Sequence, residues 1–145
     1  MNIVRLDFDE NWKCLEEYVS INFDNDIKIN NKDFMNKWSL VYNLCTQKSP
    51  FNYSSNIYNN CLELIIKILN EKKNLCDDDN VDKRTVIMSI NKGYNNSYKL
   101  FSYLDKFHTP RNKLKSVKDS IFLLKLQTIS YICKDNKELI EEFIE

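Results

Sequence analysis

Glycine and proline are scarce in this sequence of 145 residues, which holds one glycine, Gly93, and two prolines, Pro50 and Pro110. An all-β fold needs many tight turns, and these turns favour glycine and Asn-Gly pairs. The scarcity of turn residues therefore argues against an all-β protein. It also excludes the glycine-rich loops that bind nucleotide phosphates, because each of those motifs contains more than one glycine.

Histidine is scarcer still, since His108 is the only one, and none of the five cysteines stands in a CxxC pair. The ligand spacing of a zinc site is therefore missing. The acidic run at residues 77–79 also lacks the alternating ligands, the glycine and the closing glutamate of an EF-hand. A nucleophilic triad requires a base beside its nucleophile, whereas His108 precedes Pro110 closely in a turn where a helix is expected to end. We expect no catalytic residue, no metal and no cofactor.

The chain has no net charge, because 21 basic residues balance 21 acidic ones. A strong electrostatic footprint for nucleic acid is therefore absent, and we expect no nucleic-acid partner. The one local excess of basic residues, at 106–118, is interpreted as a solvated connector, with contact to a phosphate or an acidic partner as the alternative.

No apolar run is long enough to cross a bilayer, since the longest, residues 61–69, is interrupted by Glu63 and Lys67. The N-terminus lacks the apolar stretch of a signal peptide. Cys14, Cys45 and Cys61 fall among apolar helical positions, which favours buried free thiols in a reducing compartment. We expect a soluble protein of the cytoplasm, the nucleus or both, with no membrane partner.

Apolar residues recur at three- and four-residue steps along most of the chain, which is typical of amphipathic helices. The pattern predicts an all-α domain over residues 1–145, a bundle of five to six main helices followed by a short last one. Expected N-caps are Asp9, Ser54 or Ser55, and Ser116, and Gly93 is expected to kink or stop a helix. The predicted helices cover residues 9–22, 33–47, 56–72, a segment from about 82 to Gly93, 96–108, and a segment that begins at 116, with the last at 137–145.

The predicted helix at 33–47 carries more apolar residues than one core face requires. Its first face consists of Phe34, Trp38, Val41 and Cys45; Met35, Tyr42 and the flank of Leu44 form a second. Burial on all sides would explain this composition. An aromatic face that binds another protein is the alternative.

The predicted helix at 96–108 has one stripe, which consists of Leu100, Tyr103, Leu104 and Phe107. Proline cannot continue a helix and disfavours helical geometry in the residue before it. We therefore expect this helix to end at His108, and the stripe taken alone, Phe107 included, is best explained as packing on the core of the domain.

Four segments, in the same order, resemble the first N-terminal repeat of the cullins, the scaffolds of modular ubiquitin ligases. NWKCLEEYV (11–19) is similar to the cullin opening W-x-x-L-x-x-x-V, and DFMNKWSLVYNLCTQK (33–48) is similar to the second helix. LFSYLDKFHTPRN (100–112) resembles the segment L-x-Y-L-D-R-x-Y-V-x-x-N, and KSVKDSIFLLKLQ (115–127) resembles S-V-Y-D-L-G-L-x-L-F. Lys118 stands where an aromatic residue is frequent, and the fourth helix lacks a common tryptophan.

The resemblance implies a non-catalytic scaffold module of a cullin-RING ubiquitin ligase, in which helices 2 and 5 bind a BTB-fold or Skp1-like substrate adaptor. The RING subunit would bind a C-terminal half that this sequence lacks, so the chain is expected to be a fragment of a longer scaffold. Carried over by position, the adaptor contacts fall on Phe34, Met35, Trp38, Tyr42, Tyr103 and Lys106. An unrelated helical module for protein–protein interaction, with a groove for an amphipathic helix, is the alternative.

Overall fold

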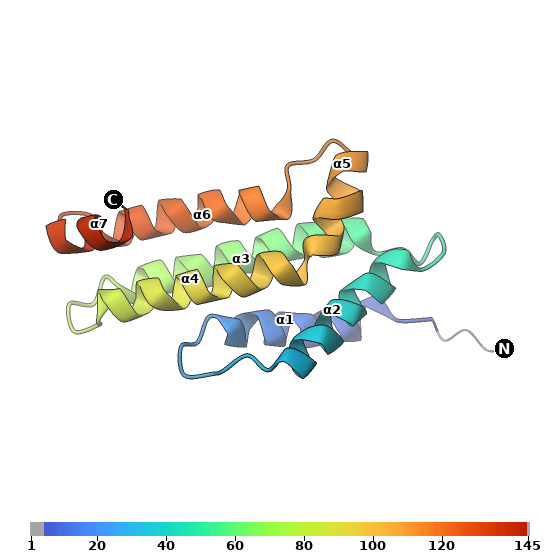
Figure 1. Cartoon of the computed structure of the whole chain (residues 1–145), viewed down its shortest axis with the longest axis horizontal. Helices are drawn as coiled ribbons and strands as arrows, with labels where there is room; N and C mark the ends of the chain where they lie inside the picture. The colour runs from blue at the N-terminus through green and yellow to red at the C-terminus, as the bar shows by residue number, and fades with distance from the viewer. Residues whose placement is uncertain (1–4, 145) are drawn as a thin grey trace.

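The structure, a computed structural model, describes residues 5–144, and within that range it is all-helical (Figure 1). The all-α prediction is confirmed. Residues 5–144 contain seven α-helices and one π-helical segment, where five to six main helices were predicted, and two of the seven α-helices are short. In chain order they are α1 (Phe8–Asn22), α2 (Asn31–Thr46), α3 (Ser54–Leu75), α4 (Lys83–Leu100), η1 (Leu104–His108), α5 (Thr109–Arg111), α6 (Val117–Ile132) and α7 (Lys137–Phe143).

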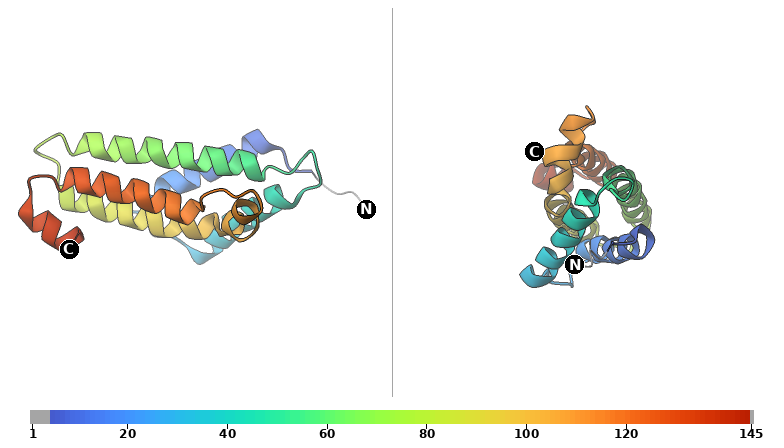
Figure 2. Two further views of the ribbon diagram at one scale, coloured as in Figure 1. Left: turned by 90° about the horizontal axis from the view of Figure 1, so that it is seen from above. Right: turned by 90° about the vertical axis from the view of Figure 1, so that its right-hand side faces the viewer.

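Three long helices, α3, α4 and α6, lie side by side and form the body of the domain (Figures 1 and 2). α1 packs against α4, and α2 crosses obliquely at one end, where it contacts α1, α3 and α4. η1 and α5 gather at the same end as α2, whereas α7 lies at the opposite end. This arrangement brings α2 and η1, distant in sequence, to one end of the molecule.

A single cluster of buried apolar side chains fills the space between these helices. Burying such side chains supplies most of the favourable free energy of folding, at about 25 cal/mol for each Å² removed from water. Every α-helix of 15 residues or more contributes to the cluster, and its largest fully buried members are Phe101, Leu15, Leu44, Ile57, Ile65, Ile87, Ile90, Leu100, Leu104 and Ile121.

The side chains that begin each helix differ in part from those predicted. Ser116 caps α6 as predicted, because its hydroxyl accepts a hydrogen bond from the Asp119 amide. α2 begins earlier than predicted, because the Asn30 side chain accepts from the amides of Lys32 and Asp33. Two predicted caps are wrong: Asp9 lies within the first turn of α1, and Ser54 and Ser55 lie inside α3, whose N-cap is Tyr53.

Gly93 neither kinks nor stops a helix, contrary to the prediction. α4 continues through it from Lys83 to Leu100, so the predicted helices on either side of Gly93 are largely one. Gly93 is buried, and a Cβ atom there would meet the ring of Phe23. The glycine therefore serves the close packing of α1 on α4 rather than the end of a helix.

Helical backbone continues past His108 and through Pro110, so the prediction that a helix ends at His108 is also wrong. The chain passes from α4 through a turn at Phe101 into the π-helical η1, and then into α5, where Pro110 lies in the first turn. A proline is tolerated in a first turn because its missing N–H has no partner there in any case. The path ends beyond Arg111, at Lys113, which has a positive φ of 54°.

Four of the five cysteines are buried and all five are free thiols. The prediction of a buried thiol is wrong for Cys14, which is exposed, and it is confirmed for Cys45 and Cys61. Among the described residues, no helix combines the length and the apolar character needed to cross a membrane.

Candidate protein interface

Four aromatic rings from α2 and the η1 region form a continuous row, here called the aromatic ladder: Trp38, Tyr42, Tyr103 and Phe107. Trp38 stacks on Tyr42 with centroids 5.7 Å apart, and Tyr42 meets Tyr103 edge-on at 5.2 Å. Tyr103 in turn lies 4.9 Å from Phe107. Such ring pairs are each worth about 0.5–1.5 kcal/mol beyond the area that they bury. The ladder therefore holds α2 and η1 together as one surface.

The spacing of residues along α2 explains which side chains join this surface. Met35, Trp38 and Tyr42 are three and four residues apart, so they share one face of the helix. Val41, Leu44 and Cys45 occupy the neighbouring face and are buried. Leu44, expected at the flank of the second face, is thus a fully buried core residue.

A hydrogen bond fixes the indole of Trp38 on the side of the ladder next to α4. Its Nε1–H donates to the hydroxyl of Ser102 over 3.2 Å. Ser102 lies between α4 and η1, so this bond connects α2 to the chain segment that leads into the second half of the ladder. A buried or half-buried indole N–H usually finds such a partner.

The ladder and its neighbour Met35 leave substantial apolar area in contact with water. The exposed fractions are 53% for Met35, 42% for Tyr42 and 41% for Phe107, while Trp38 and Tyr103 are half-buried. Burial, and after it the nearby Cys45 and Tyr42, raises the pKa of Tyr103, so its hydroxyl stays protonated at neutral pH. The surface offers aromatic contact and phenolic hydrogen bonds rather than acid–base chemistry.

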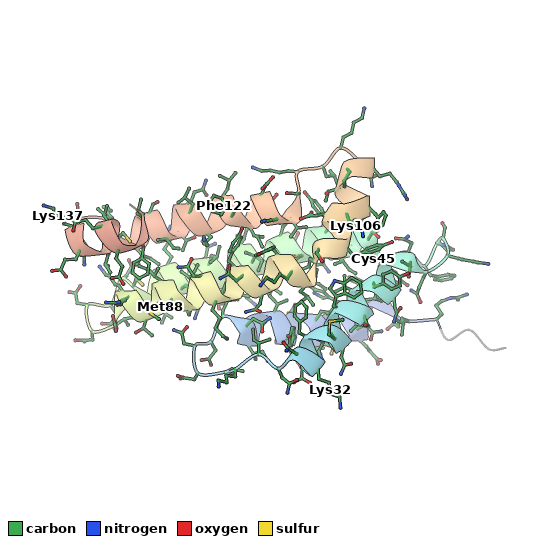
Figure 3. The ribbon with its side chains drawn as sticks, in the orientation of Figure 1. Lys32, Cys45, Met88, Lys106, Phe122 and Lys137 are labelled. Atoms are coloured by element: carbon green, nitrogen blue, oxygen red, sulfur yellow. The ribbon has the colours of Figure 1, made fainter. Side chains whose placement is uncertain are left out.

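Lys106 lies on η1 at the edge of the ladder, and Figure 3 shows it beside the C-terminal half of α2. Its side chain is exposed, and its ammonium group lies 5.6 Å from the centre of the Phe107 ring. The positive charge thus borders the exposed end of the ladder.

Phe34 is the one predicted aromatic contact that lies apart from these rings. It is half-buried in the first turns of α2 and packs against the core cluster, and none of the aromatic pairs in residues 5–144 includes it. Phe34 therefore contributes mainly to the packing of α2 on the core. It shares a helix with Trp38 and Tyr42 but forms no aromatic pair with either of them.

Phe107 was expected on the domain, and the structure instead exposes it as the last ring of the ladder. Phe101, which the predicted stripe omitted, is fully buried in its place. The predicted stripe requires one regular α-helix through this region. The turn at Phe101 and the wider π-helical turns instead rotate the side chains that follow. No sequence signal marked that change.

A polar hollow of about 470 Å³ adjoins the ladder between the end of α2, the start of α3 and α5. Tyr103 and Phe107 form one wall, and His108, Arg111 and Asn112 form another. Burial of the imidazole, and after it the positive charge of Arg111, lowers the pKa of His108. The imidazole is therefore neutral at neutral pH. Its Nδ1 lies 3.2 Å from the side-chain nitrogen of Asn112, which assigns His108 a structural role beside the ladder.

Comparison with known proteins identifies no relative: no family model, curated protein or solved structure matches the chain. Within residues 5–144, the side chains that commonly bind metals form no cluster of three.

Proposed function

We propose that the chain is a scaffold module similar to the first cullin repeat, which docks a BTB-fold or Skp1-like substrate adaptor through the aromatic ladder. The observation that carries the proposal is the contact between α2 and η1 through Trp38, Tyr42 and Tyr103. The resemblance assigns adaptor contacts to these same three residues, and Tyr103 lies more than sixty residues beyond Trp38 and Tyr42 in the sequence. In this proposal the module is non-catalytic and acts in the cytoplasm or nucleus.

The composition of the surface supports protein docking. Aromatic residues and methionine are enriched at the centres of protein interfaces, where a few anchors contribute most of the binding energy. Met35, Tyr42 and Phe107 provide exposed anchors, and the packing of Trp38 and Tyr103 holds the Tyr42 and Phe107 rings in place before binding. Because less side-chain freedom is lost on association, this preorganisation favours affinity.

Lys106 has a different role in this proposal. Its exposed ammonium group lies at the edge of the ladder, where water still surrounds it. A charge at such a rim changes the association rate and specificity more than the affinity. We expect Lys106→Glu to slow association with an adaptor that presents carboxylates, with less effect on the dissociation rate.

The proposal is tested by calorimetry of the purified chain with one BTB-fold adaptor and one Skp1-like adaptor. We expect the wild-type protein to bind one of them. Tyr103→Ala or Trp38→Ala should weaken that binding about tenfold or more, equal to about 1.4 kcal/mol, because each removes a ring from the ladder. Thermal unfolding, monitored by circular dichroism, establishes whether each variant keeps its fold.

Met35 and Met88 provide a matched control, because both are exposed methionines on helices, at 53% and 51%. Met35→Ala should weaken binding while Met88→Ala on α4 should not, and neither should unfold the protein. If neither adaptor class binds the wild-type chain, the cullin proposal is wrong, and an unrelated helical interaction module is the function that remains.

A further inference from the structure

A second group of aromatic rings lies on α4 and α6, apart from the ladder. Tyr94 and Tyr98 are neighbours on α4, with centroids 5.2 Å apart. Phe122 of α6 lies 6.0 Å from Tyr94 and is 42% exposed, and Figure 3 shows it on α6 above α4. These rings cover the seam between the two helices.

Three lysines cover the same rings. The ammonium group of Lys125 lies 4.4 Å from the centre of Tyr94 and 5.2 Å from that of Phe122. Lys118 lies 4.8 Å from Tyr98, and Lys99 approaches the same ring at 5.9 Å. We call the six residues Tyr94, Tyr98, Lys99, Lys118, Phe122 and Lys125 the lysine–aromatic patch.

Within the described part of the chain, the lysines of this patch form no ion pair with a carboxylate. The one ion pair within residues 5–144 joins Arg84 of α4 to Glu142 of α7 and includes no lysine of the patch. Asp119 is near enough to contribute to the raised pKa of Tyr94, yet it forms no ion pair with a patch lysine. Burial also lowers the pKa of Lys125, whose ammonium group has lost part of its hydration and gained no hydrogen-bond acceptor in the described chain. A carboxylate would supply what this group lacks.

We propose that the lysine–aromatic patch binds an acidic polypeptide segment of a partner protein, with partner carboxylates on Lys99, Lys118 and Lys125. Exposed Phe122, together with Leu126 one turn further along α6 and 40% exposed, gives the segment an apolar contact beside the charges. Nucleic acid fits less well, because bases would stack on aromatic faces that the lysines already occupy. This site is separate from the aromatic ladder and does not depend on the proposed function.

The test uses a short fluorescent oligoglutamate peptide and an oligothymidine, each titrated with the full chain and followed by fluorescence anisotropy at several salt concentrations. We expect the peptide to bind, with an affinity that falls as salt rises. The double variant Lys118→Gln, Lys125→Gln should weaken peptide binding about tenfold, because it removes two charge-assisted contacts.

A matched control exists at Tyr131, where Lys73 and Lys134 lie 4.4 Å and 5.7 Å from the ring, as the patch lysines lie over theirs. Lys73→Gln with Lys134→Gln removes the same amount of charge. At this site a carboxylate is already present, because Asp77 accepts a hydrogen bond from the Tyr131 hydroxyl. This control should bind the peptide like the wild type. Equal losses in both double variants would show that binding follows net charge alone, and the proposal would be overturned.

Three other outcomes also overturn the proposal. The first is no peptide binding by the wild-type protein. The second is tighter binding of oligothymidine that depends on the same lysines, which would assign the patch to nucleic acid. The third is self-association in sedimentation experiments that Lys118→Gln with Lys125→Gln abolishes, which would make a second copy of the chain the occupant.

Discussion

Gly93 sets how closely α1 and α4 approach each other. Its Cα faces the ring of Phe23, which is itself 2% exposed, and no space remains for a Cβ atom. In a helix interior glycine is less favourable than alanine by about 1 kcal/mol. The packing of the Phe23 ring against Gly93 therefore outweighs the low helix propensity of glycine.

Gly93→Ala provides a test of this balance. If helix propensity decided the outcome, alanine would stabilise the protein. We expect the reverse, a loss of about 1–3 kcal/mol in the free energy of unfolding, because the added methyl group displaces the Phe23 ring in a packed interior. Urea unfolding measures the difference. Asn95→Ala, at an exposed site on the same helix, should change stability little or raise it slightly.

Asp105 connects two elements, because its carboxylate accepts hydrogen bonds from the first turn of α6. One oxygen lies 2.6 Å from the Val117 amide and the other 3.0 Å from the Lys118 amide. These amides have no partner within the helix, and the positive end of the helix dipole favours a negative charge there. Asp105 thus fixes α6 to η1 and, through η1, to the ladder.

We expect Asp105→Ala to destabilise the protein by about 1–3 kcal/mol, because two helix-end amides, the Val117 amide partly buried, lose their acceptor. Asp105→Asn should lose less, since its amide oxygen can still accept one bond. Asp119→Ala, also in the first turn of α6 but exposed, is the control and should cost less than Asp105→Ala. Chemical unfolding compares the three variants, and equal losses for Asp105→Ala and Asp119→Ala would contradict this account.

Across the whole molecule, the reactivity of the thiols depends on how well the core excludes solvent and reagents. Burial raises the pKa of Cys45 to about 11 and raises the pKa of Cys61, Cys76 and Cys133 as well. A thiol reacts through its thiolate, so both access and ionisation oppose reaction at these four sites. Cys14 is exposed on α1.

We therefore expect one fast thiol in the native protein at neutral pH and four that react only after unfolding. Mass spectrometry of samples alkylated with iodoacetamide over time measures this pattern. In the Cys14→Ser variant the fast phase should disappear, and in denaturant all remaining thiols should react. A second fast thiol in the native protein would show that the core opens more readily than this packing implies.

Part of the candidate interface was predictable, and the reason is the regularity of α2. Spacing placed Tyr42 beside the core face of the helix, as observed, but it placed Trp38 on the core face, whereas the half-buried Trp38 ring stacks on Tyr42. The resemblance added Tyr103, and the structure places these three rings in contact. Phe34 packs against the core, as its place on the first face of the helix predicted. Phe107 was assigned to the wrong environment, because its burial depends on neighbours from other helices.

The sequence by itself determined the all-α class and most of the buried stripes, because helical periodicity is a local property that adjacent residues share. Only the tertiary structure decided that α4 continues through Gly93, that Phe101 is buried while Phe107 is exposed, and that Asp105 caps α6 from a distance. Each of these depends on a contact between segments far apart in the chain, or on a change of helical register that a regular period does not contain.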